Sequence, residues 1–316
     1  MGAAKLVYGR TVGRLGLSPV AMGWLMGVTA TVCYSFATPT ARAAITAGFD
    51  PNALLFGRMT LAVVLMLITI VATDRRLLRV PARGLNIALA AGFVNGIGML
   101  LYFWGLTRLE ASMAAMIIST GPLMVLTILF FGGEKLTYRH LVRLGLALAG
   151  VYLLVGPGGS VDTVGILLVL AAMFAFSWQV VLIQWYLHAY DARPIAFYQM
   201  LAMAVVITGW WLAHGAVWTP PTAAGWGAIV VLAVFSTFIA RLLMFNAVPR
   251  IGGGQMAMLS PLETFLSVVW SLLFLGEHLT PLQWLGGLLV MVSAALAIQR
   301  LTLGRRRRRW RVVPRV

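Results

Sequence analysis

The sequence has few charged residues and a single cysteine. Only 10% of its 316 residues are charged, whereas a soluble domain averages about 25%. Cys33 stands alone, which excludes an intrachain disulfide. Because it falls inside an apolar run, we expect it to be a small packing residue. The scarcity of charge argues against a soluble globular domain.

Groups that carry enzyme chemistry are also scarce. The chain has eight acidic residues and four histidines, and the histidines fall at the ends of predicted helices. It contains no His-Glu-x-x-His or Gly-x-Ser-x-Gly motif and no nucleotide-binding loop. We therefore expect no enzyme activity, no metal and no cofactor. Among proteins without catalysis, a pore, a receptor and an assembly protein stay open as alternatives.

Apolar residues, in contrast, make up 61% of the chain and lie in long runs. A run of about 18 or more apolar residues is long enough to cross a bilayer as a helix, and backbone groups in lipid must be satisfied within the helix. The alternating pattern of a barrel strand is missing. The sequence predicts ten transmembrane helices, near residues 20–45, 52–73, 84–106, 109–131, 139–156, 163–187, 194–213, 223–248, 251–275 and 280–301.

Basic residues give the chain a formal net charge of +16, and their placement predicts its orientation. With the N-terminus in the cytoplasm, 20 of the 24 basic residues fall on cytoplasmic segments. This asymmetry predicts that both termini are cytoplasmic. The cytoplasmic set comprises Lys5, Arg10, Arg14, Arg75, Arg76, Arg79, Arg83, Lys135, Arg139, Arg143, Arg193, Arg250, Arg300, Arg305–Arg309, Arg311 and Arg315.

The basic C-terminal tail is expected to contact membrane lipids. The run Arg305–Arg309 suits anionic lipid headgroups. No aromatic-lined nucleic-acid fold accompanies it, so no nucleic-acid partner is expected. Among the remaining basic residues, Arg58 and Arg241 lie within predicted helices.

The two halves of the chain repeat each other. Residues 100–103 match 242–245 at a spacing of 142, and 133–137 match 276–280 at a spacing of 143. Five predicted helices fall in each half, and five is odd, so the second half would enter the membrane from the opposite side. The predicted fold is an all-α membrane protein of ten transmembrane helices arranged as two inverted five-helix repeats.

The predicted organisation has five parts. They are a cytoplasmic N-terminal segment (1–19), a first five-helix repeat (20–156), a periplasmic linker (157–162), a second five-helix repeat (163–301) and a basic cytoplasmic tail (302–316).

Three prolines interrupt predicted helices and are candidate hinges. Pro39 falls in the first run, and Pro122 and Pro261 fall mid-helix in the fourth and ninth. A proline removes one backbone hydrogen bond and favours a bend. Two interpretations stay open, which are a static kink and a bending point that opens one side of a cavity.

These features resemble the drug/metabolite transporter superfamily, EamA type. In each half, an apolar helix with a proline is followed by a Gly-Glu-x-Leu-Thr turn, at 133–137 and at 276–280. The proline-to-glutamate spacing differs, with 12 residues in the first half and 16 in the second, so strict symmetry is in doubt. Within the superfamily, the chain is most similar to bacterial inner-membrane exporters of amino acids, aromatic and neutral ones included.

That resemblance implies a secondary carrier with a small-molecule substrate, working by alternating access as a monomer or weak dimer. The alternative is an exporter of drugs or other small metabolites. Glu134 and Glu277, in the two turns, are expected to cap the helices that follow them.

Two ionisable residues deep in predicted helices are the first candidates for substrate binding. Glu263 and Arg241 would lie about 20 Å and 13 Å into the membrane, at 1.5 Å per residue from a turn near 250. An ion pair between them is one interpretation. The others are that Arg241 reaches the cytoplasmic surface and that Glu263 is protonated and hydrogen-bonded.

Polar and aromatic side chains complete the predicted site, because a few polar groups between aromatic walls suit a zwitterion with an apolar side chain. For tryptophan and tyrosine the alternative is a place at the lipid interface. The predicted substrate-binding residues besides Glu263 and Arg241 are Trp104, Trp178, Tyr102, Ser35, Asn95, Asn246 and Gln255.

Overall fold

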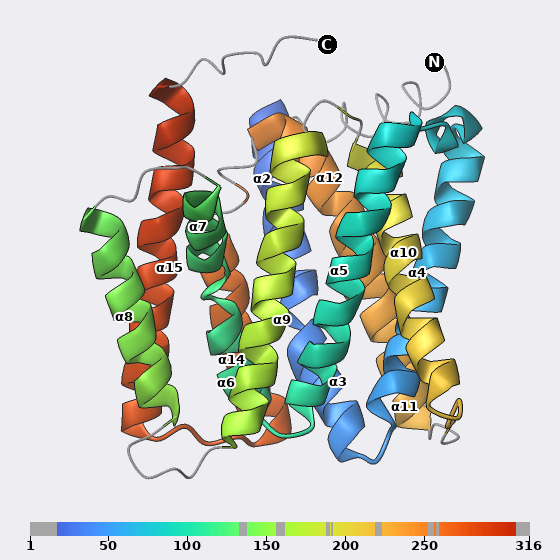
Figure 1. The fold of residues 1–316 in the computed structure, drawn as a ribbon. Coiled ribbons are helices and arrows are strands. Elements are labelled where there is room, and N and C mark those ends of the chain that lie inside the picture. The colour runs from blue at the N-terminus through green and yellow to red at the C-terminus, as the bar shows by residue number, and fades with distance from the viewer. Residues whose placement is uncertain are drawn as a thin grey trace.

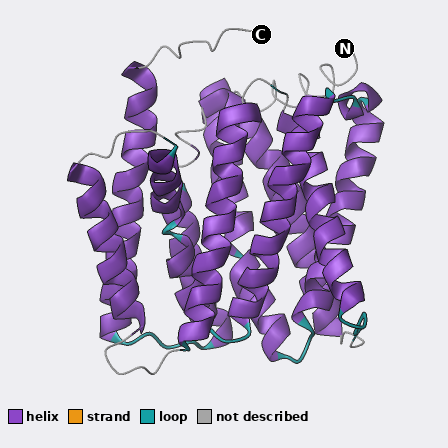
Figure 2. Ribbon diagram, viewed as in Figure 1, coloured by secondary structure: helices purple, strands orange, loops and turns teal. Residues whose placement is uncertain are grey.

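The computed structural model describes residues 18–132, 138–155, 162–187, 190, 192–218, 223–251, 256 and 259–307. Every regular element in these ranges is a helix, as Figure 2 shows. The prediction of an all-α protein is therefore confirmed for this part of the chain. Glu134 and Gln255 lie outside it.

The first half of the chain runs back and forth along one direction (Figure 1). In that view the chain descends through α2 and α3, climbs through α4, descends through α5, climbs through α6 and α7, and descends through α8. The bounds are α2 (Pro19–Ser35), α3 (Ala37–Thr46), α4 (Pro51–Thr73), η1 (Arg75–Leu78), α5 (Ala82–Leu106), α6 (Ala111–Ile118), α7 (Gly121–Phe131) and α8 (Tyr138–Val155).

The second half continues in the same bundle. It climbs through α9, descends through α10, climbs through α11, η3 and α12, descends through α14 and climbs through α15. The bounds are α9 (Thr163–Leu182), η2 (Ile183–Leu187), α10 (Ala192–Ala213), α11 (Ala223–Val230), η3 (Val231–Ile239), α12 (Ala240–Ile251), α14 (Ser260–Leu275) and α15 (Pro281–Arg307).

Helix length and composition define membrane crossings. Seven described segments are long and apolar enough to span a bilayer. They are Pro19–Thr46, Pro51–Thr73, Ala82–Leu106, Ala111–Phe131, Thr163–Leu182, Arg193–Ala213 and Ala223–Val248. Two shorter apolar helices, Ser260–Leu275 and Pro281–Ser293, accompany them.

Helix α5 packs closely between α9 and α10 because glycines line its contact faces. On one face, a Cβ at Gly96 would lie 2.9 Å from the Cβ of Val206 on α10. On another, a Cβ at Gly98 would lie 2.8 Å from the Phe176 ring on α9. Small residues at these positions allow the helices to approach closely, which is how helices associate in lipid.

The prolines mark helix boundaries in the structure. The first membrane segment breaks at Phe36, between α2 and α3, and Pro39 follows in the first turn of α3. Pro122 lies in the first turn of α7, just after α6 ends. Pro261 lies in the first turn of α14, where a missing N–H costs little. Pro122 and Pro261 are thus at the starts of helices and not in their middles.

The turn after α14 explains one of the two repeated Gly-Glu-x-Leu-Thr motifs. Gly276 ends the helix with a φ of 64°, which favours glycine. Both carboxylate oxygens of Glu277 accept backbone hydrogen bonds from α6, from Ala111 N at 2.7 Å and Ser112 N at 2.9 Å. Glu277 therefore caps α6, in the other half of the chain, and the prediction that it caps the following helix is wrong.

The following helix, α15, has a different cap. The amide of Thr280 donates to Gln283 Oε1 at 2.9 Å, and the amide of Gln283 donates back to Thr280 Oγ1 at 3.3 Å. This reciprocal arrangement satisfies the free N–H groups at the start of the helix. Glu277 is consequently free to reach α6.

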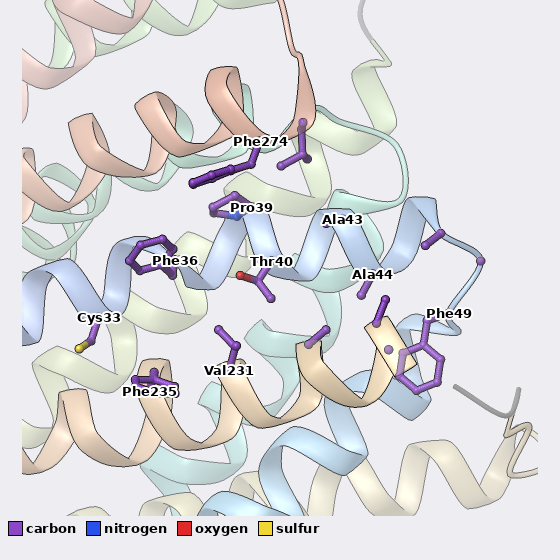
Figure 3. Close-up of a pocket in the computed structure, with 16 residues that line it drawn as sticks. Cys33, Phe36, Pro39, Thr40, Ala43, Ala44, Phe49, Val231, Phe235 and Phe274 are labelled. Atoms are coloured by element: carbon purple, nitrogen blue, oxygen red, sulfur yellow. The ribbon is translucent and has the colours of Figure 1, made fainter. Parts of the chain in front are cut away.

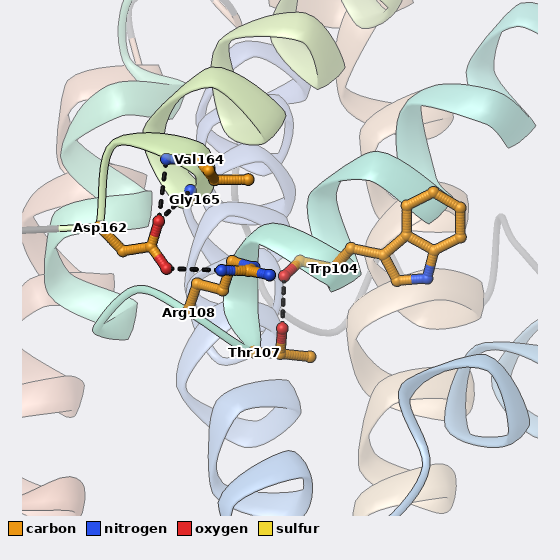
Figure 4. Close-up of polar contacts among 6 residues, drawn as sticks. All are labelled: Trp104, Thr107, Arg108, Asp162, Val164 and Gly165. Atoms are coloured by element: carbon orange, nitrogen blue, oxygen red, sulfur yellow. Dashed lines mark hydrogen bonds and ion pairs between the residues drawn. The ribbon is translucent and has the colours of Figure 1, made fainter.

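An ion pair connects the two halves at the same end of the bundle (Figure 4). Arg108 Nη1, after the end of α5, lies 2.8 Å from Asp162 Oδ2, and Asp162 Oδ1 accepts from the amides of Val164 and Gly165 at the start of α9. These hydrogen bonds, chiefly the one from Arg108, lower the pKa of Asp162. Asp162 thus caps α9 and fastens it to α5.

Candidate functional site

A buried arginine that the sequence analysis did not select as a site residue lies inside the bundle. Arg58 is in the second turn of α4 and is only 6% exposed. Its Nε donates to Thr237 Oγ1 at 2.9 Å, and its guanidinium carbon lies 5.9 Å from the centre of the Phe103 ring. A cation over an aromatic face is attracted by the ring quadrupole. The guanidinium is therefore held on two sides.

Helix η3 positions the partner of Arg58. It is a π-helix of nine residues, a geometry that often marks functional sites. Within it, the Thr237 hydroxyl donates to the carbonyl of Leu232 at 2.7 Å. Because that bond uses the hydroxyl proton, the oxygen is left to accept the hydrogen bond from Arg58.

Two tyrosines link Arg58 to the predicted ionisable residues. Tyr102 on α5 shares a 2.7 Å hydrogen bond with Thr38 on α3 and interacts electrostatically with Arg58 and Glu263. Tyr34 on α2 interacts electrostatically with Arg241, Glu263 and Arg58. We call Tyr34, Arg58, Tyr102, Arg241 and Glu263 the central polar cluster. Its members come from both halves of the chain.

Glu263 and Arg241 share this cluster without forming an ion pair. Glu263 lies in the first turn of α14, where the positive end of a helix favours a carboxylate. Arg241 lies in the first turn of α12, and its Nε is buried without a hydrogen-bond partner. No ion pair joins the two side chains in the part of the chain that the structure describes. Both side chains interact electrostatically with Tyr34.

The other predicted site residues lie in three surroundings. Ser35 is buried beside the cluster and accepts a hydrogen bond from Trp270 Nε1 at 3.0 Å. Asn95 is buried on α5 and donates to the sulfur of Met203 at 3.2 Å. Asn246 donates to the Leu242 carbonyl of its own helix at 2.9 Å.

The two tryptophans lie away from the cluster. Trp104 donates to Asn52 Oδ1 at 3.1 Å and packs against Trp210. Trp178 is 37% exposed and stacks with Phe174 on the outside of α9. Glu263, Arg241 and Tyr102 thus belong to the central polar cluster, whereas Ser35, Trp104 and Trp178 have other partners.

Two apolar cavities lie on the flanks of the bundle. One, of about 630 Å³, runs between α3, η3 and the end of α14 (Figure 3). Pro39 and Phe274 lie next to each other on its wall, and Phe274 is 68% exposed, so the cavity opens on the surface. The other, of about 950 Å³, lies between α5 and α10 and includes Trp104. Neither is lined by a charged residue.

The chemistry available at the centre is ionic and hydrogen-bonding. Two guanidinium groups, one carboxylate and two phenols can bind an organic molecule that carries both charge and apolar surface. Within the ranges that the structure describes, no three of the histidine, cysteine and acidic side chains cluster as metal ligands would.

These features define a multi-pass, all-helical membrane protein with ionisable groups buried among its spans. The model of the EamA-like transporter family matches residues 21–156 and 163–299, once in each half of the chain. The chain therefore belongs to the EamA-like transporter family of the drug/metabolite transporter superfamily, as its sequence motifs predicted. It has two repeat units.

Two similar proteins are named as transporters, and neither name gives a substrate. The chain is 25% identical over 301 residues to the uncharacterized transporter YcbK of Bacillus subtilis (strain 168), covering 90% of this chain and 96% of that protein. It is 22% identical over 203 residues to an uncharacterized transporter of Archaeoglobus fulgidus, covering 64% of this chain and 73% of that protein. A solved crystal structure with 22% identity superposes with a TM-score of 0.60 over 90% of this chain and 98% of its own, which indicates the same fold.

Proposed function

We propose that this protein is a secondary carrier that exports amino acids, aromatic and neutral ones included, across the bacterial inner membrane by alternating access. We further propose that it crosses the membrane ten times as two inverted five-helix repeats, with both termini in the cytoplasm. On this proposal the protein is a monomer or weak dimer whose basic tail contacts anionic lipids.

The directions of the helices support the inverted arrangement. The first half begins with a descending segment, α2 and α3, and the second with a climbing one, α9 (Figure 1). Helix contacts also exchange under the repeat. The pair α5–α9 has its counterpart in α12–α2, and α5–α10 in η3–α4, while α4–α10, α6–α14 and α8–α15 each join equivalent helices of the two halves. Such a pseudo-dyad is the basis of alternating access in many carriers.

The observation that carries the function is the central polar cluster at the contact between the halves. Ionisable groups inside a membrane are costly, about 2.5–3.5 kcal/mol each on insertion scales, and they mark substrate or ion pathways. Arg241 and Glu263 offer opposite charges that both interact with Tyr34, which suits the two charges of a zwitterion. Tyr34, Tyr102 and Phe103 supply aromatic surface beside them.

Counterflow in liposomes that contain only the purified full-length protein tests the proposal. We expect saturable uptake of labelled phenylalanine or leucine that is accelerated by unlabelled amino acid inside. Uptake without such acceleration would identify a pore. In Glu263→Gln we expect uptake to fall about tenfold or more, because a charged hydrogen-bond partner contributes roughly 1.5–3 kcal/mol. A folded Glu263→Gln protein with unchanged rates at every pH would remove Glu263 from the mechanism.

The alternative is an exporter of drugs or other small metabolites. The two apolar cavities favour it, because they offer about 630 and 950 Å³ of space without charge. Competition of amino acids and of uncharged aromatic drugs against labelled phenylalanine separates the two. Drugs that compete better than any amino acid would favour the alternative.

A further inference from the structure

We propose that Arg58 and Arg241 together bind the carboxylate of the substrate, so that the transported compounds are carboxylates and organic cations are rejected. This inference rests on the proposed function, since it assigns the substrate class of the same site. It adds Arg58 as a binding residue and separates amino acids from cationic drugs.

The central polar cluster has an excess of positive charge. Arg58 and Arg241 interact electrostatically with each other as like charges. The single acidic member is Glu263, and no ion pair joins it to either arginine in the part of the chain that the structure describes. Two guanidinium groups against one carboxylate leave one positive charge in excess. A buried charge without a partner is costly, and an anionic ligand relieves both that cost and the mutual repulsion.

Arg58 has hydrogen-bond donors that no described residue uses. A guanidinium has five N–H donors, and within the described residues Arg58 uses Nε alone, toward Thr237. Phe103 lies next to the group, with its ring centre 5.9 Å from the guanidinium carbon. The terminal nitrogens remain, and they form the fork that matches a carboxylate with two parallel hydrogen bonds. The buried Nε of Arg241 has no hydrogen-bond partner among the described residues and offers a further donor.

The position equivalent to Arg58 in the other half of the chain is neutral. Helices α4 and α10 align at a spacing of 141, which pairs Arg58 with Gln199, and Thr237 pairs with Asn95 at 142. Gln199 Oε1 accepts from Gln179 Nε2 at 3.4 Å, and Asn95 binds the Met203 sulfur. The fold thus accepts glutamine at this place. The positive charge at Arg58 is consequently a property of one half, as an anion-binding group on one side of a pseudo-dyad would be.

Three ligands with the same ring test the substrate class. L-phenylalanine has a carboxylate and an amine, 3-phenylpropanoate has the carboxylate alone, and 2-phenylethylamine has the amine alone. Their dissociation constants are measured on the full-length protein in detergent, from the dependence of the melting temperature on ligand concentration. We expect both carboxylates to bind and the amine to bind at least about tenfold more weakly.

Arg58→Gln is the decisive variant, since it copies the residue of the equivalent position in the other half. We expect it to weaken both carboxylates about tenfold or more and to leave 2-phenylethylamine unweakened, while Arg58→Lys loses less. The matched control is Arg76→Gln, which removes the same charge from the exposed helix η1 and should bind as the unaltered protein does. Should Arg58→Gln fail to fold, Arg241→Gln is the second variant, and it should likewise weaken both carboxylates about tenfold or more.

The inference is overturned if 2-phenylethylamine binds as tightly as phenylalanine, if the carboxylates bind unchanged to Arg58→Gln, or if neither carboxylate binds at all. Its failure is distinct from that of the proposed function. Phenylalanine counterflow that does not depend on Arg58 would support the carrier function and contradict carboxylate binding by the two arginines. Arg58-dependent binding without counterflow would support carboxylate binding by the arginines and contradict the carrier function.

Discussion

Two buried charged residues of this protein have hydrogen-bond partners in the other half of the chain. Glu277 bonds α6 across 165 and 166 positions of sequence, and Arg58 bonds Thr237 across 179. Each is buried, at 9% and 6% exposure. Removing one partner of a buried hydrogen bond leaves the other unsatisfied, which costs more than the bond itself contributes.

Glu277→Gln should therefore destabilise the protein. A glutamine side chain offers one oxygen where the carboxylate uses two, so either Ala111 N or Ser112 N would face an NH₂ group. We expect a loss of about 1–3 kcal/mol, seen as a lower melting temperature in detergent. Gln283→Glu is the control, because a glutamate retains the capping oxygen for Thr280. Equal melting temperatures for Glu277→Gln and the unaltered protein would contradict the cap.

At the scale of helices, packing against a neighbour decides which positions must be small. Helix α5 contacts both α9 and α10, and a Cβ at Gly92 would press against the backbone carbonyl oxygen of Gln199 on α10. A backbone group cannot rotate out of the way as a side chain can. A Cβ at Gly209, also on α10, would have no atom within 4 Å.

Gly92→Ala should push α5 and α10 apart. Overpacking of this kind costs about 1–3 kcal/mol, so we expect a lower melting temperature and a smaller folded fraction by size-exclusion chromatography in detergent. Gly209→Ala, in open space, should match or slightly exceed the unaltered protein, since alanine favours helix. A Gly92→Ala protein as stable as the Gly209→Ala protein would show that the two helices are not in close contact.

The helices could be predicted from the sequence because long apolar runs determine them. The contacts between helices could not be predicted in this way. The long run 84–106 predicted α5, which spans Ala82–Leu106. Pro39, Pro122 and Pro261 marked the break after α2 and the starts of α7 and α14, but the sequence predicted a bend within a helix at each place and not a helix boundary. The sequence did mark the turn containing Glu277 but could not identify α6 as its partner.

The candidate site was predictable only in part, for a similar reason. Glu263 and Arg241 stood out as ionisable residues deep in apolar runs, and the structure brings both beside Tyr34. Arg58 lies seven residues after Pro51, about 10 Å along the helix, where a long side chain could equally reach the membrane surface. Its repeat partner is the neutral Gln199. Only the distant contact with Thr237 reveals that Arg58 points inward.

At the scale of the whole molecule, the ends of the bundle differ from its centre. Near one end, Arg108 and Asp162 join α5 to α9 (Figure 4). Glu277 joins the turn after α14 to α6. The central polar cluster draws on α2, α4, α5, α12 and α14. A carrier needs such a site to open toward each side of the membrane in turn.

Access to the centre of the bundle from both sides tests the account most directly. Because Cys33 is the single cysteine, a Cys33→Ser protein carrying Ser35→Cys has one thiol, one residue from Tyr34. In proteoliposomes of known orientation, we predict that a membrane-impermeant thiol reagent labels this protein from either face, and that phenylalanine slows both reactions. Labelling from one face alone, with and without phenylalanine, would contradict alternating access through the central polar cluster.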